Sequence, residues 1–254
     1  MVKVGINGFG RIGRNVLRAA LDNPDIQIVA INDLTDSKTL AHLLKYDSLL
    51  GKLDAEVTAG EGGLVVDGKP ITVFSERNPA SIPWRQREVD IVIEATGLFT
   101  DREKAAVHIH SGGAKRVIIS APGKNDDLTI VMGVNESLYS PDKHYVISNG
   151  SCTTNGLAPA AQVLHQHFGI KHGLMNTTHA YTNSQALHDQ PEMEAGCVGR
   201  RCYLSSVHHS TSAGASVYGR DWNSPFECVN DAGAFLRITS VADKGLVDTQ
   251  EKRL

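Results

Sequence analysis

Short runs of β-branched and aliphatic residues alternate with amphipathic helical segments along the first 150 residues. Between the first two runs, residues 11–22 carry apolar side chains at helical spacing, and Pro24 follows as a stop signal. Strands that alternate with helices are typical of a parallel sheet with helices packed on it. We therefore expect an α/β fold with a doubly wound parallel sheet. Its strands are expected at residues 2–7, 26–32, 90–95, 116–120, 129–134 and 144–148.

Two local patterns add a hairpin and a helix to this expected fold. Residues 65–73 contain two short apolar runs joined by Asp67 and Gly68, a pair that favours the tight turn of an antiparallel hairpin. We expect this hairpin at the edge of the sheet. Residues 100–103 have the spacing of a capping box with Thr100 as the cap, which predicts a helix that runs to about Ser111.

A second long helix is expected to begin near Ser151 and to end by Gly169. Its apolar side is expected to carry Leu157, Ala160, Ala161, Val163 and Leu164. From about Pro191 onward the apolar periodicity fades, while Gly, Ser, His and Cys become more frequent. The pattern therefore places no individual elements in that part of the chain.

Composition narrows the class of protein. The 254 residues suffice for one large domain or two modest ones. The net charge of −3 and the lack of a basic run argue against nucleic acid as a partner. No apolar stretch approaches a membrane span and the N-terminus has no signal-peptide pattern, so we expect a cytoplasmic protein with no membrane partner. Four Cys without a CxxC pair predict neither a disulfide framework nor a metal site.

Residues 8–13 read GFGRIG, which fits the GxGxxG pattern between a predicted strand and a predicted helix. Gly8 is expected to make the tight turn, Gly10 to let the backbone approach a pyrophosphate, and Gly13 to allow close helix–sheet packing. Asp33, at the end of the next strand, is placed to accept hydrogen bonds from ribose hydroxyls, and its charge favours NAD over NADP. The alternative is a glycine-rich packing turn without a ligand.

Cys152 lies where the second long helix is expected to begin. A thiolate in the first turn of a helix is stabilised by the helix dipole and by unpaired backbone N–H groups, which makes it a candidate nucleophile for aldehyde chemistry. The alternative is a buried structural cysteine. His179, 27 residues further on, could face this thiol as a base, and the hydroxyls of Thr153 and Thr182 could donate to a phosphate. Most other histidines are expected to be solvated, including His108, His110, His165 and His167.

A family resemblance rests on residues 2–14, 31–34, 43–48, 94–97, 120–124, 148–149, 151–155 and 179–183. Together these segments closely resemble phosphorylating glyceraldehyde-3-phosphate dehydrogenase of the bacterial type. The resemblance runs from residue 1 to about residue 190. It implies a Rossmann-type NAD-binding domain over residues 1–150 and an α+β catalytic domain with an antiparallel sheet over residues 151–254. The resemblance further implies that the second domain is truncated relative to the family and that it diverges after about residue 192.

The resemblance also implies site residues. Cys152 matches the nucleophile and His179 the base that activates it. The cofactor positions are Gly8, Gly10, Arg11, Ile12, Gly13, Asp33, Arg77, Thr96, Gly97 and Ser120, where the backbone N–H groups of Arg11 and Ile12 would bind the pyrophosphate. The phosphate positions are Ser151, Thr153 and Thr182, and Arg237 weakly resembles a further one.

The implied reaction is the NAD-dependent oxidation of glyceraldehyde 3-phosphate to 1,3-bisphosphoglycerate in glycolysis, through a thiohemiacetal and a thioester on Cys152. The implied partners are glyceraldehyde 3-phosphate, inorganic phosphate and three further copies of the chain in a homotetramer.

Two alternatives remain open. The chain could be a catalytically inactive NAD-binding remnant, because residues that position the nicotinamide and one phosphate are altered or missing. It could also be an erythrose-4-phosphate dehydrogenase, although residues 179–183 favour the triose enzyme. A frameshift is one hypothesis for the divergence, because codons for the VHHS at residues 207–210 permit the family's SIIP when they are shifted by one base.

Overall fold

The computed structural model describes residues 1–60 and 62–170, together with the short segments 207–208, 227–228, 240–242 and 245–247. The chain divides between Gly150 and Ser151 into two units.

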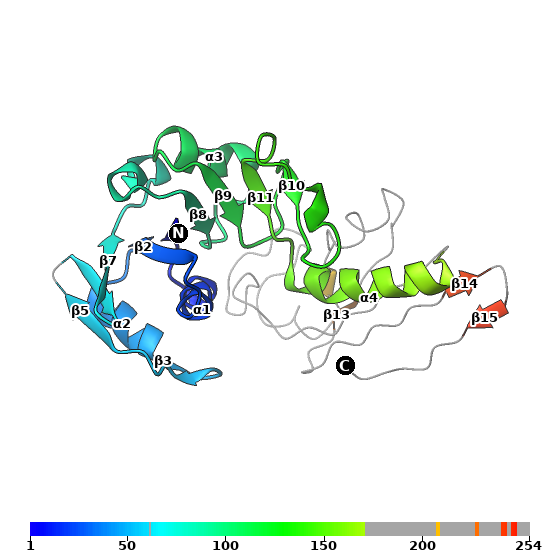
Figure 1. Ribbon diagram of the computed structural model, residues 1–254, viewed down its shortest axis with the longest axis horizontal. Helices are drawn as coiled ribbons and strands as arrows, with labels where there is room; N and C mark the ends of the chain where they lie inside the picture. The colour runs from blue at the N-terminus through cyan, green and yellow to red at the C-terminus, as the bar shows by residue number, and fades with distance from the viewer. Residues whose placement is uncertain (61, 171–206, 209–226, 229–239, 243–244, 248–254) are drawn as a thin grey trace. The chain divides into compact units, whose positions relative to one another are not determined.

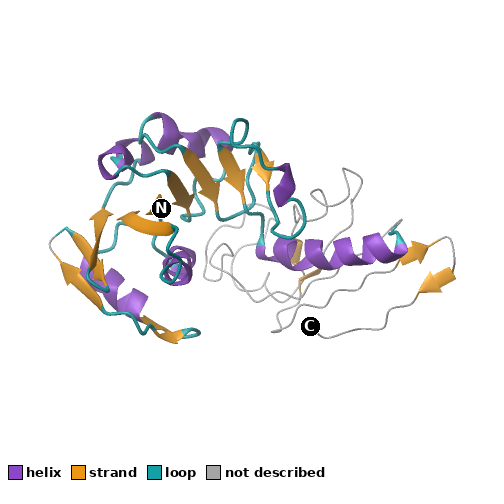
Figure 2. Ribbon diagram, viewed as in Figure 1, coloured by secondary structure: helices purple, strands orange, loops and turns teal. Residues whose placement is uncertain are grey.

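A nine-stranded sheet organises the first unit, in the order β10-β11-β9-β8-β1-β2-β7-β6-β5 (Figures 1 and 2). The strands from β10 to β7 pair in parallel, and β6 and β5 continue the sheet antiparallel. The run β7-β2-β1-β8-β9-β11 has the 3-2-1-4-5-6 order of a Rossmann fold, so the expected doubly wound sheet is confirmed. The strands are β1 (Val2–Asn7), β2 (Ile26–Asn32), β5 (Val57–Gly60), β6 (Gly63–Val66), β7 (Lys69–Phe74), β8 (Ile91–Glu94), β9 (Arg116–Ile119), β10 (Leu128–Thr129) and β11 (Val146–Ser148).

Three α-helices lie among the described residues of this unit. They are α1 (Arg11–Ala20), α2 (Ser37–Lys45) and α3 (Arg102–His110). Helix α2 was not expected from the hydrophobic pattern, although Asp36 supplies a cap whose side chain accepts a hydrogen bond from the Thr39 backbone N–H at 2.9 Å. Short elements complete the unit: the ladder of β3 (Tyr46–Asp47) with β4 (Gly51–Lys52), and the 3₁₀ turns η1 (Pro79–Ser81), η2 (Trp84–Arg87) and η3 (Glu136–Leu138).

Each face of the sheet buries its own hydrophobic cluster. Successive residues of a strand point to opposite faces, and the neighbours Ala30 and Ile31 of β2 belong to different clusters. Ala30 packs in the cluster that contains Ala105 of α3. Ile31 packs in the cluster that contains Leu17 of α1 and Leu44 of α2. The helices therefore cover both faces, as a doubly wound sheet requires.

The expected edge hairpin is confirmed. Strands β6 and β7 pair antiparallel, and both residues of the turn between them have positive φ, 46° at Asp67 and 74° at Gly68. Two consecutive positive φ angles are the signature of the type I′ turn that Asp-Gly favours.

The expectation of a strand over residues 129–134 was wrong, because only Leu128–Thr129 joins the sheet there. The following backbone turns away at Gly133, which has a φ of 81°. The Asn135 side chain holds this turn, since it accepts from the Val131 N–H at 2.8 Å and donates to the Thr129 carbonyl at 2.9 Å. Backbone groups that a strand would use are thus bonded to a side-chain amide.

The predicted helix after residue 100 is present as α3, but its cap is one residue later than expected. The Asp101 side chain accepts from the Glu103 N–H at 3.0 Å, so Asp101 and not Thr100 is the N-cap. A carboxylate at the first turn also interacts favourably with the helix dipole, which explains why Asp101 takes this position.

The second unit begins with α4 (Cys152–Phe168), whose bounds agree with the predicted helix. Its buried stripe contains Ala158 and Ala161, whereas Val163 is 55% exposed, so the expected apolar side was wrong at that position. Val163 lies two residues beyond Ala161, about 200° around a helix of 3.6 residues per turn, and faces the other side.

Four short strands of the second unit are described: β12 (Val207–His208), β13 (Glu227–Cys228), β14 (Ser240–Ala242) and β15 (Gly245–Val247). They pair antiparallel, β12 with β13 and β14 with β15, which confirms the expected antiparallel character. Within the described ranges, no helix combines the length and apolar character needed to cross a membrane.

Candidate functional site

A cleft of about 380 Å³ opens at the carboxyl ends of the parallel strands in the first unit. The strand order reverses between β1 and β8, and crevices at such switch points are where open α/β sheets bind ligands. The residues that line the cleft follow the ends of β1, β2, β7 and β8. They are Asn7, Gly8, Gly10, Asn32, Asp33, Leu34, Glu76, Arg77, Pro79, Ala95, Thr96, Leu98 and Phe99.

The glycine turn between β1 and α1 forms one wall of the cleft. Gly8 has a φ of 90°, and a Cβ on it would meet the Thr96 backbone nitrogen at 2.8 Å. A Cβ on Gly13 would lie 2.3 Å from the Gly8 carbonyl oxygen, so this position requires glycine for the close approach of helix and strand. Gly10 has open space on the side where a Cβ would lie, because no atom beyond its chain neighbours comes within 4 Å of that position. That space, at a helix start where no side chain makes a cap, suits a phosphate group.

Asp33 is half-buried at the cleft and is held by two backbone donors. Its Oδ2 accepts from the Phe9 N–H at 2.8 Å and its Oδ1 from the Thr35 N–H at 2.9 Å. An ionised carboxylate has about four acceptor positions, so both oxygens keep capacity for ribose hydroxyls. A dinucleotide therefore fits the residues of this cleft.

The opposite wall is fixed by a side-chain clamp that the sequence pattern did not reveal. The Asn32 amide donates to the Glu76 carbonyl at 2.9 Å and accepts from the Glu76 N–H at 2.8 Å. This pair of bonds holds the segment that carries the exposed Arg77 at the rim of the cleft. The partners are 44 residues apart in sequence, and no local pattern connects them.

The expected cofactor residues divide into three groups. Gly8, Gly10, Asp33, Arg77 and Thr96 line the cleft. Arg11 and Ile12 are exposed in the first turn of α1, and Gly13 is buried beneath them. Gly97 and Ser120 are not among the lining residues.

The structure places His108 differently from the expectation that it is solvated. Its side chain is completely buried on α3, while His110, His165 and His167 are exposed as expected. His108 follows the buried Ala105 by three residues, so both lie on the side of α3 that faces the sheet. That spacing is the signal that sequence reasoning could have used.

In the second unit, Cys152 is the first residue of α4 and is exposed. Ser151 caps the helix, because its Oγ accepts from the Thr154 N–H at 2.9 Å. The same hydroxyl lies 2.8 Å from the Thr153 hydroxyl and 2.7 Å from the Thr154 hydroxyl. A thiol thus stands beside a group of hydroxyls at a helix N-terminus, where negative charge is stabilised. His179, Thr182 and Arg237 lie outside the described residues.

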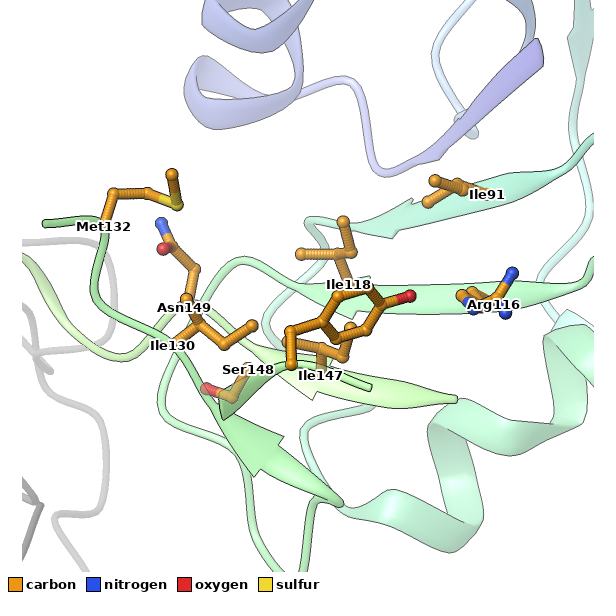
Figure 3. A pocket seen from close by; sticks show the side chains of 9 residues that line it. Ile91, Arg116, Ile118, Ile130, Met132, Ile147, Ser148 and Asn149 are labelled. Carbon is orange, nitrogen blue, oxygen red and sulfur yellow. The ribbon is translucent and has the colours of Figure 1, made fainter. Parts of the chain in front are cut away.

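A second cleft, of about 280 Å³, lies on the sheet of the first unit (Figure 3). Its floor is apolar, with Ile91 of β8, Ile118 of β9 and Ile147 of β11. Met132 lies at one end and is 68% exposed. In the described part of the chain, no group of three or more His, Cys, Asp or Glu side chains is arranged to hold a metal ion.

The switch-point cleft, the glycine turn and the acidic residue after β2 define a Rossmann-type dinucleotide-binding domain, which is followed by a unit with a cysteine at a helix N-terminus. Residues 2–102 match the model of the "Glyceraldehyde 3-phosphate dehydrogenase, NAD binding domain". Residues 151–218 match that of the "Glyceraldehyde 3-phosphate dehydrogenase, C-terminal domain". The chain belongs to the glyceraldehyde 3-phosphate dehydrogenase family. The expected cofactor, NAD, is confirmed by the identity of the matched N-terminal domain.

Curated relatives from bacteria support this assignment. The chain is 63% identical over 193 residues to glyceraldehyde-3-phosphate dehydrogenase of Geobacillus stearothermophilus and 60% identical over 193 residues to glyceraldehyde-3-phosphate dehydrogenase 1 of Bacillus subtilis. Each alignment covers 76% of this chain and 57% of the relative. For glyceraldehyde-3-phosphate dehydrogenase 2 of Bacillus subtilis the identity is 51% over 216 residues, which cover 85% of this chain and 63% of the relative. The chain therefore spans less than two thirds of the length of these relatives.

Proposed function

We propose that this protein oxidises glyceraldehyde 3-phosphate with NAD and inorganic phosphate, as a glycolytic enzyme of the cytoplasm. The observation that carries the proposal is that one chain has both a dinucleotide cleft in its first unit and an exposed cysteine at the start of α4 in its second. Residues 1–150 form the NAD-binding domain in this proposal, and residues 151–254 form the catalytic domain. Glyceraldehyde 3-phosphate and inorganic phosphate are its small-molecule partners. The assembly in this proposal is a homotetramer, and light scattering tests it by measuring the molar mass in solution.

The roles of the cofactor residues follow from the geometry of the cleft. Gly8 and Gly10 leave space for the pyrophosphate, and the N–H groups at the start of α1 donate to it. Asp33 accepts from the adenosine ribose hydroxyls, and its charge repels a 2′-phosphate, which favours NAD over NADP. Arg77 and Thr96 contact the cofactor from the other walls of the cleft. Gly97 and Ser120 are assigned to the cofactor site by the family resemblance alone.

Cys152 is the nucleophile in the proposed reaction. Its thiolate attacks the aldehyde carbon to form a thiohemiacetal, and His179 takes part as the base. Bound NAD supplies the hydride acceptor. The thioester that remains on Cys152 is cleaved by inorganic phosphate, which releases 1,3-bisphosphoglycerate and regenerates the thiolate. Ser151, Thr153, Thr182 and Arg237 bind the phosphate groups.

The test is NADH formation from NAD, glyceraldehyde 3-phosphate and inorganic phosphate, followed by absorbance. Cys152→Ser is the matched control, because it changes one atom at the exposed start of α4 and leaves the cap at Ser151 intact. We expect phosphate-dependent turnover that this variant abolishes without loss of NAD binding. A parallel assay with erythrose 4-phosphate identifies the better aldehyde.

Other outcomes would contradict the proposal. Binding of NAD without turnover means that the chain is an NAD-binding protein and not a dehydrogenase. Turnover that is faster with erythrose 4-phosphate overturns the assigned substrate. Turnover that persists in Cys152→Ser removes the thiolate from the mechanism.

A further inference from the structure

A connected set of buried polar side chains lies behind the NAD cleft, and the proposed mechanism does not use it. The Trp84 indole N–H donates to His108 Nδ1 at 3.0 Å, and His108 Nε2 lies 2.9 Å from Glu94 Oε2. The Asn7 amide donates to the same Glu94 oxygen at 2.6 Å. None of these four side chains is more than 2% exposed.

The partners of His108 determine where its proton resides. An indole N–H can only donate, so Nδ1 of His108 must be the acceptor of the bond from Trp84. The ring proton is therefore on Nε2, which points at the Glu94 carboxylate. His108 is a neutral donor in this arrangement, because protonation of Nδ1 would place two donors face to face.

Both carboxylate oxygens of Glu94 accept hydrogen bonds. His108 and Asn7 donate to Oε2, while the backbone N–H of Thr96, at 2.9 Å, and the Thr96 hydroxyl donate to Oε1. Four donors occupy the roughly four acceptor positions of an ionised carboxylate. A buried carboxylate is tolerated only when such bonds replace its hydration, so the loss of one donor would disturb the others.

The cleft side of this network forms the cofactor wall. Asn7 and Thr96 both line the cleft, and the Asn7 carbonyl accepts from the Ala95 N–H at 2.8 Å. The Asn7 side chain also accepts from the Asn32 amide at 2.8 Å, the same amide that clamps the segment with Arg77. The orientation of three cleft-lining segments therefore depends on the carboxylate of one buried residue.

We propose that His108 is a positioning residue of the NAD site. Through its Nε2–H it satisfies and orients the Glu94 carboxylate, which in turn holds the Asn7 and Thr96 walls in the geometry that binds the dinucleotide. His108 does not touch the cofactor. The inference rests on the proposed binding of NAD by the first unit.

Three variants separate this role from a purely structural one. His108→Leu removes the donor to Glu94. His108→Gln keeps a donor, because its amide nitrogen takes the place of imidazole Nε2. Trp84→Phe breaks the far bond and leaves the bond between His108 and Glu94 intact.

All three variants should unfold more easily than the parent, because each changes a completely buried side chain. NAD affinity should differ among them. At a temperature where circular dichroism shows every variant folded, we expect the Kd for NAD from calorimetric titration to rise at least about tenfold in His108→Leu, and to stay within about threefold in His108→Gln and Trp84→Phe.

Several results would overturn the inference. An unchanged Kd in His108→Leu makes His108 a core residue only, and an equal rise in Trp84→Phe means that affinity follows stability. A parent protein that binds no NAD refutes the proposed function itself. If His108→Leu does not fold, the ¹⁵N shifts of the His108 ring in the parent protein decide: we expect the Nε2–H tautomer with and without NAD, and a proton on Nδ1 overturns the assignment.

Discussion

At the scale of single residues, the glycine turn shows how one pattern serves two purposes. Gly13 is required by packing, because its Cβ would lie 2.3 Å from a backbone oxygen. Gly10 lies in open space at a φ of −70°, which other residues adopt readily. The structure therefore separates a glycine that the fold needs from one that the ligand needs, a distinction that the sequence pattern alone does not contain.

A pair of alanine substitutions tests this separation. Gly13→Ala should lower the free energy of unfolding by about 1–3 kcal/mol, because the backbone of Gly8 must move to admit the methyl group. Gly10→Ala should change it by less than about 1 kcal/mol, yet weaken NAD binding because the methyl group occupies space for the pyrophosphate. Urea denaturation and NAD titration measure the two effects. A loss of stability in Gly10→Ala that equals the loss in Gly13→Ala would contradict the assignment.

At the scale of elements, the start of α3 offers a direct test of the corrected cap. Asp101→Ala removes the side-chain acceptor for the Glu103 N–H and should cost about 1 kcal/mol of unfolding free energy. Thr100→Ala is the matched control and should cost clearly less, because Thr100 does not make the cap. Denaturation curves recorded under the same conditions give the free energy of unfolding of each variant. An equal loss of unfolding free energy in the two variants, or a larger loss in Thr100→Ala, would support Thr100 as the N-cap, as the sequence predicted.

The junction of α1 with the β3–β4 ladder predicts a pH dependence. Backbone N–H groups of Leu50 and Leu49 donate to Asp47, and together with the ion pair to Arg11 they lower its pKa from 3.8 to about 2. A carboxyl group whose pKa is lower in the folded state stabilises the fold above its unfolded pKa and loses this effect as the pH falls toward the folded pKa.

Asp47→Asn keeps an acceptor for these N–H groups but removes the charge. We therefore expect the variant to be less stable than the parent at neutral pH, with a difference that stays constant down to about pH 4 and then shrinks toward pH 2. Chemical denaturation of both proteins across this pH range measures the difference. A difference that persists undiminished at pH 2 would show that the charge of Asp47 is not its source.

Elements were predictable where the signal is local. The parallel sheet wrapped by helices could be anticipated from the alternation of strands and helices, and the hairpin from Asp67 and Gly68. The strand over residues 129–134 failed because the amide of Asn135 competes with the sheet for backbone hydrogen bonds, an outcome that apolar content does not report. Partners far apart in sequence were also missed, such as Asn32 with the segment at Glu76.

At the scale of the whole molecule, the same reasoning explains what could be anticipated of the candidate site. The glycine turn and Asp33 follow a spacing that physical chemistry imposes on dinucleotide binding, so the sequence sufficed to locate the cleft. The spacing of His108 from Ala105 indicates the inward face of α3, but its hydrogen-bond partners Glu94 and Trp84 come from other segments, which no local pattern connects to it. A polar network of this kind becomes visible only when the fold brings its members together.

The apolar cleft on the sheet carries the last prediction, which concerns association between molecules. Exposed apolar surface favours self-association, and Met132, which is 68% exposed, lies at this cleft. Met132→Glu should reduce concentration-dependent association in light scattering, because a carboxylate there must be desolvated before the cleft can be covered. Leu49→Glu is the control, since Leu49 is 81% exposed outside the lining of this cleft and the substitution adds the same charge. Equal reduction by both variants would assign the effect to net charge, whereas a larger effect at Met132 assigns it to the cleft.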